Sequence, residues 1–178
     1  YTFRNFFENK FKDHKIIEPT IDDWINHLST LFPQVRLKQF LEIRSMDACS
    51  WDLICSQTAF WVGLLYSDSS FHKAQDLVES WTQEDRNYIN KAAPKYGLQA
   101  KFKEGTILDI AQKLFEISKQ GLDTRNILAR NKKYNETYYL KDLERNLTLG
   151  LSPADILVNK FNNDWNQNID NIYSENIF

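Results

Sequence analysis

Residues 32–47, FPQVRLKQFLEIRSMD, carry the strongest pattern in the chain, because apolar and charged side chains alternate along them from Val35 to Arg44. Successive residues of a β-strand point to opposite faces of a sheet, so this alternation predicts one strand over 35–44. One face reads Val35, Leu37, Gln39, Leu41 and Ile43, and the other reads Arg36, Lys38, Phe40, Glu42 and Arg44. Alternation alone is equally typical of a solvated outer sheet surface, and that interpretation stays open at this point.

The second of these faces carries the groups that an ATP-using site needs. Glu42 offers a hard carboxylate oxygen for a divalent ion, and Arg44, two residues further on, offers a planar set of donors for phosphate. Arg36 and Lys38 share this face, where they would bind a substrate carboxylate or phosphate, or else occupy a surface or sheet-edge position. The sequence has no glycine-rich phosphate loop, so a nucleotide site here depends on carboxylates, cations and a sheet.

Most of the remaining chain has helical patterns. Phe3, Phe6, Phe7 and Phe11 form the stripe of an amphipathic helix, and capping signals at Thr20, Ser50, Thr82, Thr106 and Ser152 predict further helix starts. The expected helices cover 21–31 before Pro33, 51–66, 70–81, 83 to a point before Pro94, 107–120 with Gly121 at C′, about 135–149 with Gly150 as the stop, and one from Pro153. These patterns indicate a mostly helical α+β protein.

Composition narrows the class of protein. A length of 178 residues, 42% of them hydrophobic, is enough for one domain with a core, and the formal charge of −2 gives no global basic field for nucleic acid. No apolar run is long enough to span a membrane, so we expect small-molecule or protein partners. Cys49 and Cys55 are too few for a disulfide framework and lack the spacing of a zinc site, which favours free thiols in a reducing compartment.

Several further residues have an ordinary structural interpretation. His27 on a helix is more often a hydrogen-bonding residue than a ligand, and Asp47, just past the strand, would support Arg44. Arg125 could reach a ligand from a loop, but no role is matched to it. Core positions are expected for the aromatic residues Trp24, Trp51, Phe60 and Trp61.

The run EIRSMD (42–47), with Trp24, His27, Leu28 and FPQVRLK (32–38) before it and FWVGLLY (60–66) after it, resembles glutamate–cysteine ligase of the plant and proteobacterial type. The resemblance continues through Gly121, Leu122, Arg125, Leu140, Gly150, Ser152 and Ala154 to Trp165. Members of that family are considerably longer. We therefore expect residues 1–178 to be the C-terminal portion of a single ligase catalytic domain, inactive without its missing N-terminal part. Ser45 replaces the glycine that is usual in the plant-like motif, which bears on the subfamily rather than on the reaction.

The resemblance also implies a fold and a reaction. The fold is an antiparallel sheet curved into a cup, related to glutamine synthetase, with helices packed outside and with ATP, L-glutamate and Mg²⁺ on the concave face. Glu42 would be a metal ligand, and Arg44 the catalytic arginine that steadies the transferring phosphoryl group. ATP would phosphorylate the γ-carboxylate of glutamate, and the amine of L-cysteine would capture the acyl phosphate to give γ-glutamylcysteine, the first step of glutathione biosynthesis.

Two alternatives stay open beside this hypothesis. Related carboxylate–amine ligases share the Glu-x-Arg strand and accept other amines, and a non-catalytic helical interaction module would keep the fold without the chemistry. The expected location is the cytoplasm, or a plastid if the protein is of the plant type.

Overall fold

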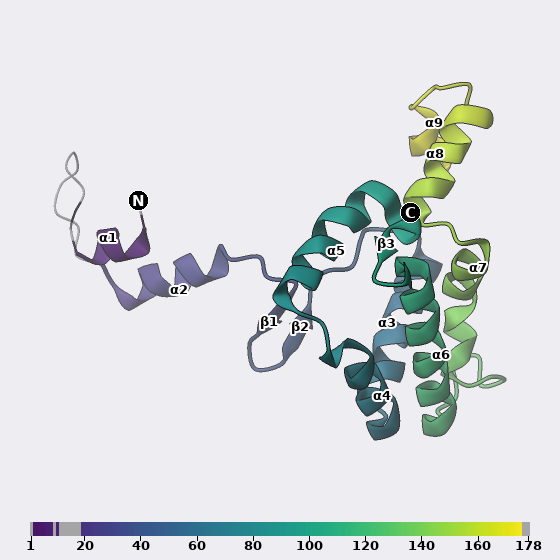
Figure 1. Ribbon diagram of the computed structural model, residues 1–178, viewed down its shortest axis with the longest axis horizontal. Coiled ribbons are helices and arrows are strands. Elements are labelled where there is room, and N and C mark those ends of the chain that lie inside the picture. Colours follow the sequence, from purple (N-terminus) through teal and green to yellow (C-terminus); the bar gives the residue numbers. More distant parts are fainter. Residues whose placement is uncertain (1, 9, 11–18, 176–178) are drawn as a thin grey trace. The chain divides into compact units, whose positions relative to one another are not determined.

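The computed structural model describes residues 2–8, 10 and 19–175. The chain divides into two compact units, residues 1–47 and residues 48–178. The first unit contains helices α1 (Phe3–Phe7) and α2 (Ile21–Ser29) and strands β1 (Val35–Leu37) and β2 (Leu41–Ile43) (Figure 1).

The expected single strand over 35–44 is wrong, because the chain reverses in its middle. Strands β1 and β2 form an antiparallel hairpin in which Val35 pairs with Ile43, Arg36 with Glu42 and Leu37 with Leu41. The backbone N–H of Lys38 donates to the carbonyl of Phe40 at 2.9 Å and closes the turn. Residues 38–40 contain none of the Gly, Pro, Asn or Asp residues that usually mark a hairpin turn, so the reversal has no local sequence signal.

The reversal still leaves the charged side chains on one face. Directly opposite residues of an antiparallel pair point to the same side of the sheet, and each pair here joins two odd or two even positions. Arg36 and Glu42 therefore share a face across the two strands, as the alternation predicted along one strand.

The helices of the first unit contact each other through aromatic rings. Thr20 and Asp23 form the predicted capping box of α2, and the helix ends with Thr30 as its C-cap, earlier than expected. The Phe3 ring stacks on His27 with centroids 4.3 Å apart and lies 5.1 Å from Trp24. The predicted stripe also includes Phe11, which lies outside the described residues.

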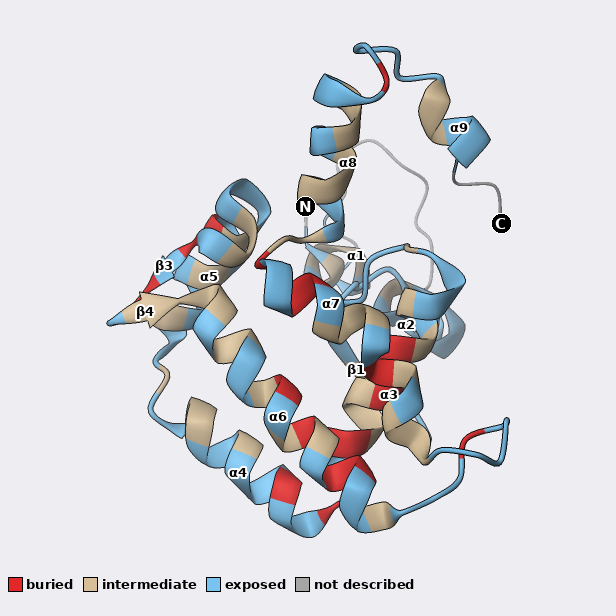
Figure 2. Ribbon diagram, turned by 90° about the vertical axis from the view of Figure 1, so that its right-hand side faces the viewer, coloured by how far each residue is buried: buried red, intermediate tan, exposed pale blue. Residues whose placement is uncertain are grey.

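The second unit is mostly helical. Its elements are α3 (Trp51–Leu65), α4 (Asp68–Glu79), α5 (Gln83–Tyr96), the 3₁₀-helix η1 (Gly97–Gln99), strands β3 (Lys101–Phe102) and β4 (Gly105–Thr106), α6 (Ile107–Arg125), the 3₁₀-helix η2 (Glu136–Leu140), α7 (Lys141–Leu149), α8 (Pro153–Asn163) and α9 (Asn171–Glu175). Its core gathers where α3, α6 and α7 face each other (Figure 2). The buried cluster consists of Ala59, Phe115, Leu122, Leu140 and Leu147.

Helices α3 and α6 approach closely enough to require glycine at two positions. A Cβ on Gly63 would clash with the backbone carbonyl and hydroxyl of Ser118, and a Cβ on Gly121 would clash with the carbonyl of Gly63. The Ser118 hydroxyl donates to the carbonyl of Phe60 at 2.8 Å across the same contact. The expected helix end at Gly121 is therefore wrong: Gly121 is a packing residue, and α6 ends at Arg125 with Asn126 in the left-handed conformation.

Three other helix boundaries also need correction. Helix α4 covers Asp68–Glu79 instead of the expected 70–81. Helix α5 was expected to end before Pro94 but continues through it to Tyr96, because the missing N–H of a proline this close to the helix end costs only one hydrogen bond. Instead of one helix over 135–149, residues 136–140 form η2 before α7 begins. The predicted caps at Thr82, Thr106 and Ser152 are confirmed, whereas Ser50 precedes α3 without a side-chain capping bond.

The expected core role of the aromatic residues holds only in part. Phe60 packs against the core cluster, but Trp51 is 71% exposed and Trp24 is also exposed. Trp165 is the buried tryptophan, and its indole N–H donates to the Glu175 carboxylate at 2.6 Å.

The α+β class is confirmed in its coarse form. Among the described residues the only sheets are two antiparallel two-stranded pairs, β1–β2 and β3–β4, and the glutamine-synthetase-like cup stays a prediction. No helix in the described part of the chain is long and apolar enough to cross a membrane.

Candidate functional site

The centre of the candidate site is the ion pair between Arg36 and Glu42 on the β1–β2 hairpin. The Arg36 Nε–H donates to the Glu42 Oε2 at 2.7 Å, directly across the two strands. Both side chains are only partly exposed, which makes this one of the less solvated ion pairs among the described residues. The hairpin therefore holds the predicted metal-binding carboxylate in one orientation with an arginine.

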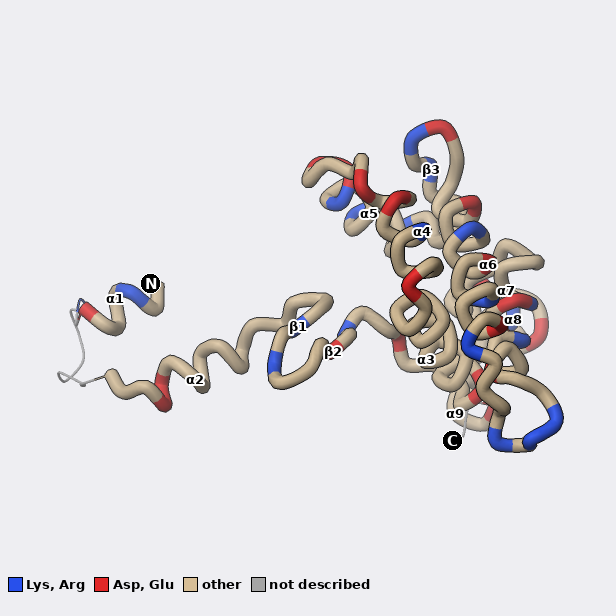
Figure 3. Tube along the Cα trace, turned by 90° about the horizontal axis from the view of Figure 1, so that it is seen from below, with Lys and Arg blue, Asp and Glu red and all other residues tan. Residues whose placement is uncertain are grey.

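Positive charge keeps Glu42 ionised. The hydrogen bond from Arg36 lowers the pKa of the Glu42 carboxyl, and the charges of Arg36, Arg44 and Lys38 lower it further. Three cations from the same stretch thus act on one carboxylate. Lys and Arg positions recur along the hairpin in Figure 3, and the role of these residues as one site stays a prediction.

Arg44 follows β2 and extends the hairpin by one residue. Its backbone N–H donates to the Gln34 carbonyl at 2.8 Å, and its guanidinium carbon lies 4.9 Å from the centroid of the Phe32 ring. Its Nη1 is buried and has no hydrogen-bond partner among the described residues. A buried donor without an acceptor is costly, and an oxyanion such as phosphate would satisfy it.

The described residues do not supply a full set of ligands for the predicted metal ion. No group of three or more His, Cys, Asp or Glu side chains within 2–8, 10 and 19–175 is placed to hold a metal ion. Glu42 can supply one ligand, since Arg36 occupies Oε2 alone. Mg²⁺ needs several oxygen ligands, so further carboxylates, substrate oxygens or water would have to complete the site.

The secondary candidates have structural roles or none. His27 packs on Phe3, and Arg125 pairs with Glu136 at 3.3 Å while its guanidinium lies over the Tyr66 ring. Asp47 is exposed and forms no hydrogen bond or ion pair with a described residue, so the prediction that it supports Arg44 is wrong. Cys49 and Cys55 are both half-buried, and the Gln57 amide donates to the Cys49 sulfur at 3.2 Å.

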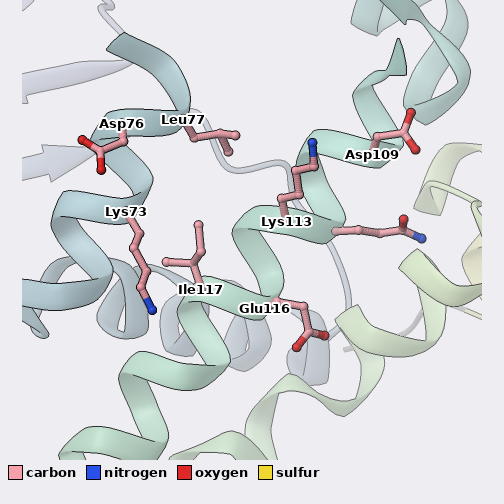
Figure 4. Close-up of a pocket in the computed structure, with 8 residues that line it drawn as sticks. Lys73, Asp76, Leu77, Asp109, Lys113, Glu116 and Ile117 are labelled. Carbon is pink, nitrogen blue, oxygen red and sulfur yellow. The ribbon is translucent and has the colours of Figure 1, made fainter. Parts of the chain in front are cut away.

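Sequence reasoning missed a groove between α4 and α6. This open groove of about 710 Å³ is lined by Lys73, Asp76, Leu77, Asp109, Gln112, Lys113, Glu116 and Ile117 (Figure 4). The Lys73 ammonium donates to Gln120, and the Asp109 carboxylate is engaged in capping α6 with Thr106. Because the groove brings no reactive set of groups together, the hairpin remains the better candidate for chemistry.

The fold and site define an α+β protein with two charged groups on one hairpin. These are the Arg44 guanidinium, whose Nη1 has no acceptor among the described residues, and the Glu42 carboxylate, which is paired with Arg36. The family model described as Glutamate-cysteine ligase family 2 matches residues 6–175. The chain belongs to this family, which confirms the resemblance read from the sequence.

Curated relatives extend the comparison. Chloroplastic glutamate–cysteine ligase A of Oryza sativa subsp. indica is 34% identical over 177 residues, which cover 99% of this chain and 35% of the relative. The chloroplastic enzymes of Solanum lycopersicum and Arabidopsis thaliana are each 34% identical over 99% of this chain and over 32% and 33% of their own length. The chain thus spans about a third of the length of these relatives. Their names place the relatives in the chloroplast, so they lend no support to the expected cytoplasmic location.

Proposed function

We propose that this chain contributes to an ATP-dependent ligase that joins the γ-carboxylate of L-glutamate to the amine of L-cysteine. Family membership and relatives named glutamate–cysteine ligase support the reaction class. The structural observation that carries the proposal is the buried Nη1 of Arg44, a cationic donor that has no acceptor among the described residues and acts on the ionised Glu42 carboxylate. The proposal covers the full activity, of which this chain would supply one part.

The chemistry runs in two steps. A γ-carboxylate oxygen of glutamate attacks the γ-phosphorus of ATP, the bond to the β–γ bridging oxygen breaks, and ADP leaves. The cysteine amine then attacks the acyl carbon, inorganic phosphate leaves, and the amine loses a proton. Negative charge builds up on phosphoryl oxygens in the first step and is carried away by the leaving phosphate in the second.

Arg44 is the residue we assign to that charge. Its unmatched donor would bond a phosphoryl oxygen, and such fixed positive charge in a site shielded from water lowers the barrier to phosphoryl transfer. Loss of one preorganised donor typically costs about 10²–10³ in kcat. Arg44 would therefore be a catalytic residue that also binds ATP.

The ion pair gives Glu42 and Arg36 linked roles. Glu42 would present its free oxygen to Mg²⁺, whose known function in such reactions is to neutralise the phosphates of ATP. Arg36 would hold that carboxylate through Oε2, so we now assign it a positioning role in addition to the expected contact with substrate. Lys38, exposed at the turn, remains a proposed contact for a substrate carboxylate or phosphate.

The test is phosphate release from ATP with glutamate and Mg²⁺, with and without cysteine. It uses the 178-residue chain and, in parallel, the longest natural form of the protein. We expect cysteine-stimulated release by the longer form and its collapse in Glu42→Gln and Arg44→Ala, with an unchanged circular dichroism spectrum. Asp47→Asn is the matched control, since that exposed carboxylate of the same segment has no described partner.

Other outcomes would redirect the proposal. Release that depends on a different amine would keep the ligase and change its acceptor. Absence of release with every amine would favour the interaction module. Chloroplast import of a reporter fused to the natural N-terminus would test the plastid location that the names of the relatives suggest.

A further inference from the structure

We propose that Phe32 is a positioning residue for Arg44, and that its ring holds the guanidinium in place while leaving the hydrogen-bond donors free for phosphate. This inference rests on the proposed function of Arg44 and adds a residue to which that function assigns no part. The guanidinium carbon of Arg44 lies 4.9 Å from the centroid of the Phe32 ring, within the range of a cation–π contact.

The exposure of Phe32 argues against a role in the core. The side chain is 78% exposed, and the ring makes no described contact with another aromatic ring. Among the described side chains, the Arg44 guanidinium is the group with which the Phe32 ring makes a cation–π contact. An exposed large apolar residue gains little from burial, so the contact with the cation is the specific interaction it makes.

The backbone around Phe32 fixes where the ring lies. Pro33 follows it, and a residue before proline is restricted to extended conformations. Gln34 then accepts the hydrogen bond from the backbone N–H of Arg44 at 2.8 Å. The hydrogen bond between Arg44 and Gln34 therefore brings Arg44 close to Phe32, which lies two residues before Gln34.

The choice of an aromatic ring has a chemical reason. A carboxylate beside Arg44 would hold the guanidinium too, but it would neutralise the charge and occupy the N–H donors. The face of an aromatic ring attracts the guanidinium through the ring quadrupole. The N–H groups, which lie in the plane of the guanidinium, stay available to another acceptor. The unpartnered Nη1 is consistent with this arrangement, and so is the absence of a described bond from Asp47 to Arg44.

The first measurement tests the contact without turnover. In the 178-residue chain with labelled arginine, we expect the ring current of Phe32 to displace the NMR signal of the Arg44 guanidinium, and Phe32→Leu to abolish that displacement. Tyr96→Leu is the matched control, because Tyr96 is 55% exposed and its ring lies at the same 4.9 Å from a cation, Lys95. An Arg44 signal that Phe32→Leu leaves in place would overturn the proposal.

The second measurement tests the consequence for catalysis. In the active full-length form, Phe32→Leu should lower kcat by about two- to fivefold, the range expected for an exposed cation–π contact, and should change the KM for glutamate little. Phe32→Tyr should restore kcat, and fluorinated phenylalanines at position 32 should lower it in order of fluorine number. In an Arg44→Lys background the loss caused by Phe32→Leu should shrink.

The outcomes separate this inference from the proposed function. If Arg44→Lys cripples turnover while Phe32→Leu does not, Arg44 keeps its role and the positioning role of Phe32 is refuted. If Arg44→Lys leaves turnover unchanged, both proposals fail. A loss in Phe32→Leu that fluorination does not reproduce would show that ring size, rather than the cation–π contact, matters, and would also overturn the proposal.

Discussion

Replacement of Gly121 by alanine tests the packing of α3 against α6. The added Cβ would meet the Gly63 carbonyl group, whose carbon would lie 2.9 Å away, and the Ser70 hydroxyl at 2.8 Å. Overpacking typically costs about 1–3 kcal/mol, and we take about 3 because the obstacle is backbone. Alanine recovers about 1 kcal/mol of helix propensity. The net loss of about 2 kcal/mol should lower the melting temperature by about 4–8 °C.

The sign of the change makes this test informative. If the helix were loosely packed at Gly121, alanine would stabilise the protein by about 1 kcal/mol. If Gly121 were a left-handed C′ residue, asparagine would be tolerated better than alanine. We expect the opposite order, with Gly121→Asn worse than Gly121→Ala in thermal and denaturant unfolding. Gly150, which has φ +66 at the C-cap of α7, is the control position where asparagine should be the better replacement. A stabilised Gly121→Ala would refute the reasoning.

Three further predictions concern the helix caps, the C-terminal helix and the hairpin. Thr106→Ala removes the cap of α6 and should cost about 1 kcal/mol in denaturant unfolding, whereas Thr124→Ala in the same helix should cost little. Hydrogen bonds from Lys160 and then Trp165 lower the pKa of Glu175, so the contribution of this contact to stability is present above the normal glutamate pKa and is lost as the pH falls through the lowered value. The amide protection factors of α9, corrected for the intrinsic pH dependence of exchange, should therefore fall on acidification, and Glu175→Gln should remove that dependence. Amides of β1 and β2 should exchange much faster than those of α6 near Phe115, and equal protection would contradict the burial pattern.

Helix caps, which depend on a few neighbouring residues, could be predicted from the sequence, whereas contacts between helices could not. The caps at Thr20, Thr82, Thr106 and Ser152 are confirmed because a capping box is made within four consecutive residues. The prediction of a helix end at Gly121 is wrong because glycine serves both helix ends and close helix contacts, and only the position of Gly63 on another helix distinguishes the two roles.

The candidate site shows the same division. Alternation identified which side chains share a face, and that grouping survives because the hairpin pairs even positions with even positions. Alternation could not show the reversal at residues 38–40, which has no turn residue, or the pairing of Arg36 with Glu42 that follows from it. The contact between Phe32 and Arg44 also depends on that fold and has no signature in spacing.

The distribution of burial links the site to stability. None of the described residues up to Asp47 is buried, whereas the core lies within the second unit. The apolar side chains of the hairpin, Val35, Leu37 and Leu41, are exposed, and a two-stranded hairpin is at best marginally stable by itself. Segments with few buried contacts are where binding and catalytic elements commonly lie, because they can adjust to a ligand at little cost. Substitutions at Glu42 and Arg44 should therefore affect chemistry while the helical core keeps its stability, which is the separation that the activity and circular dichroism measurements are designed to detect.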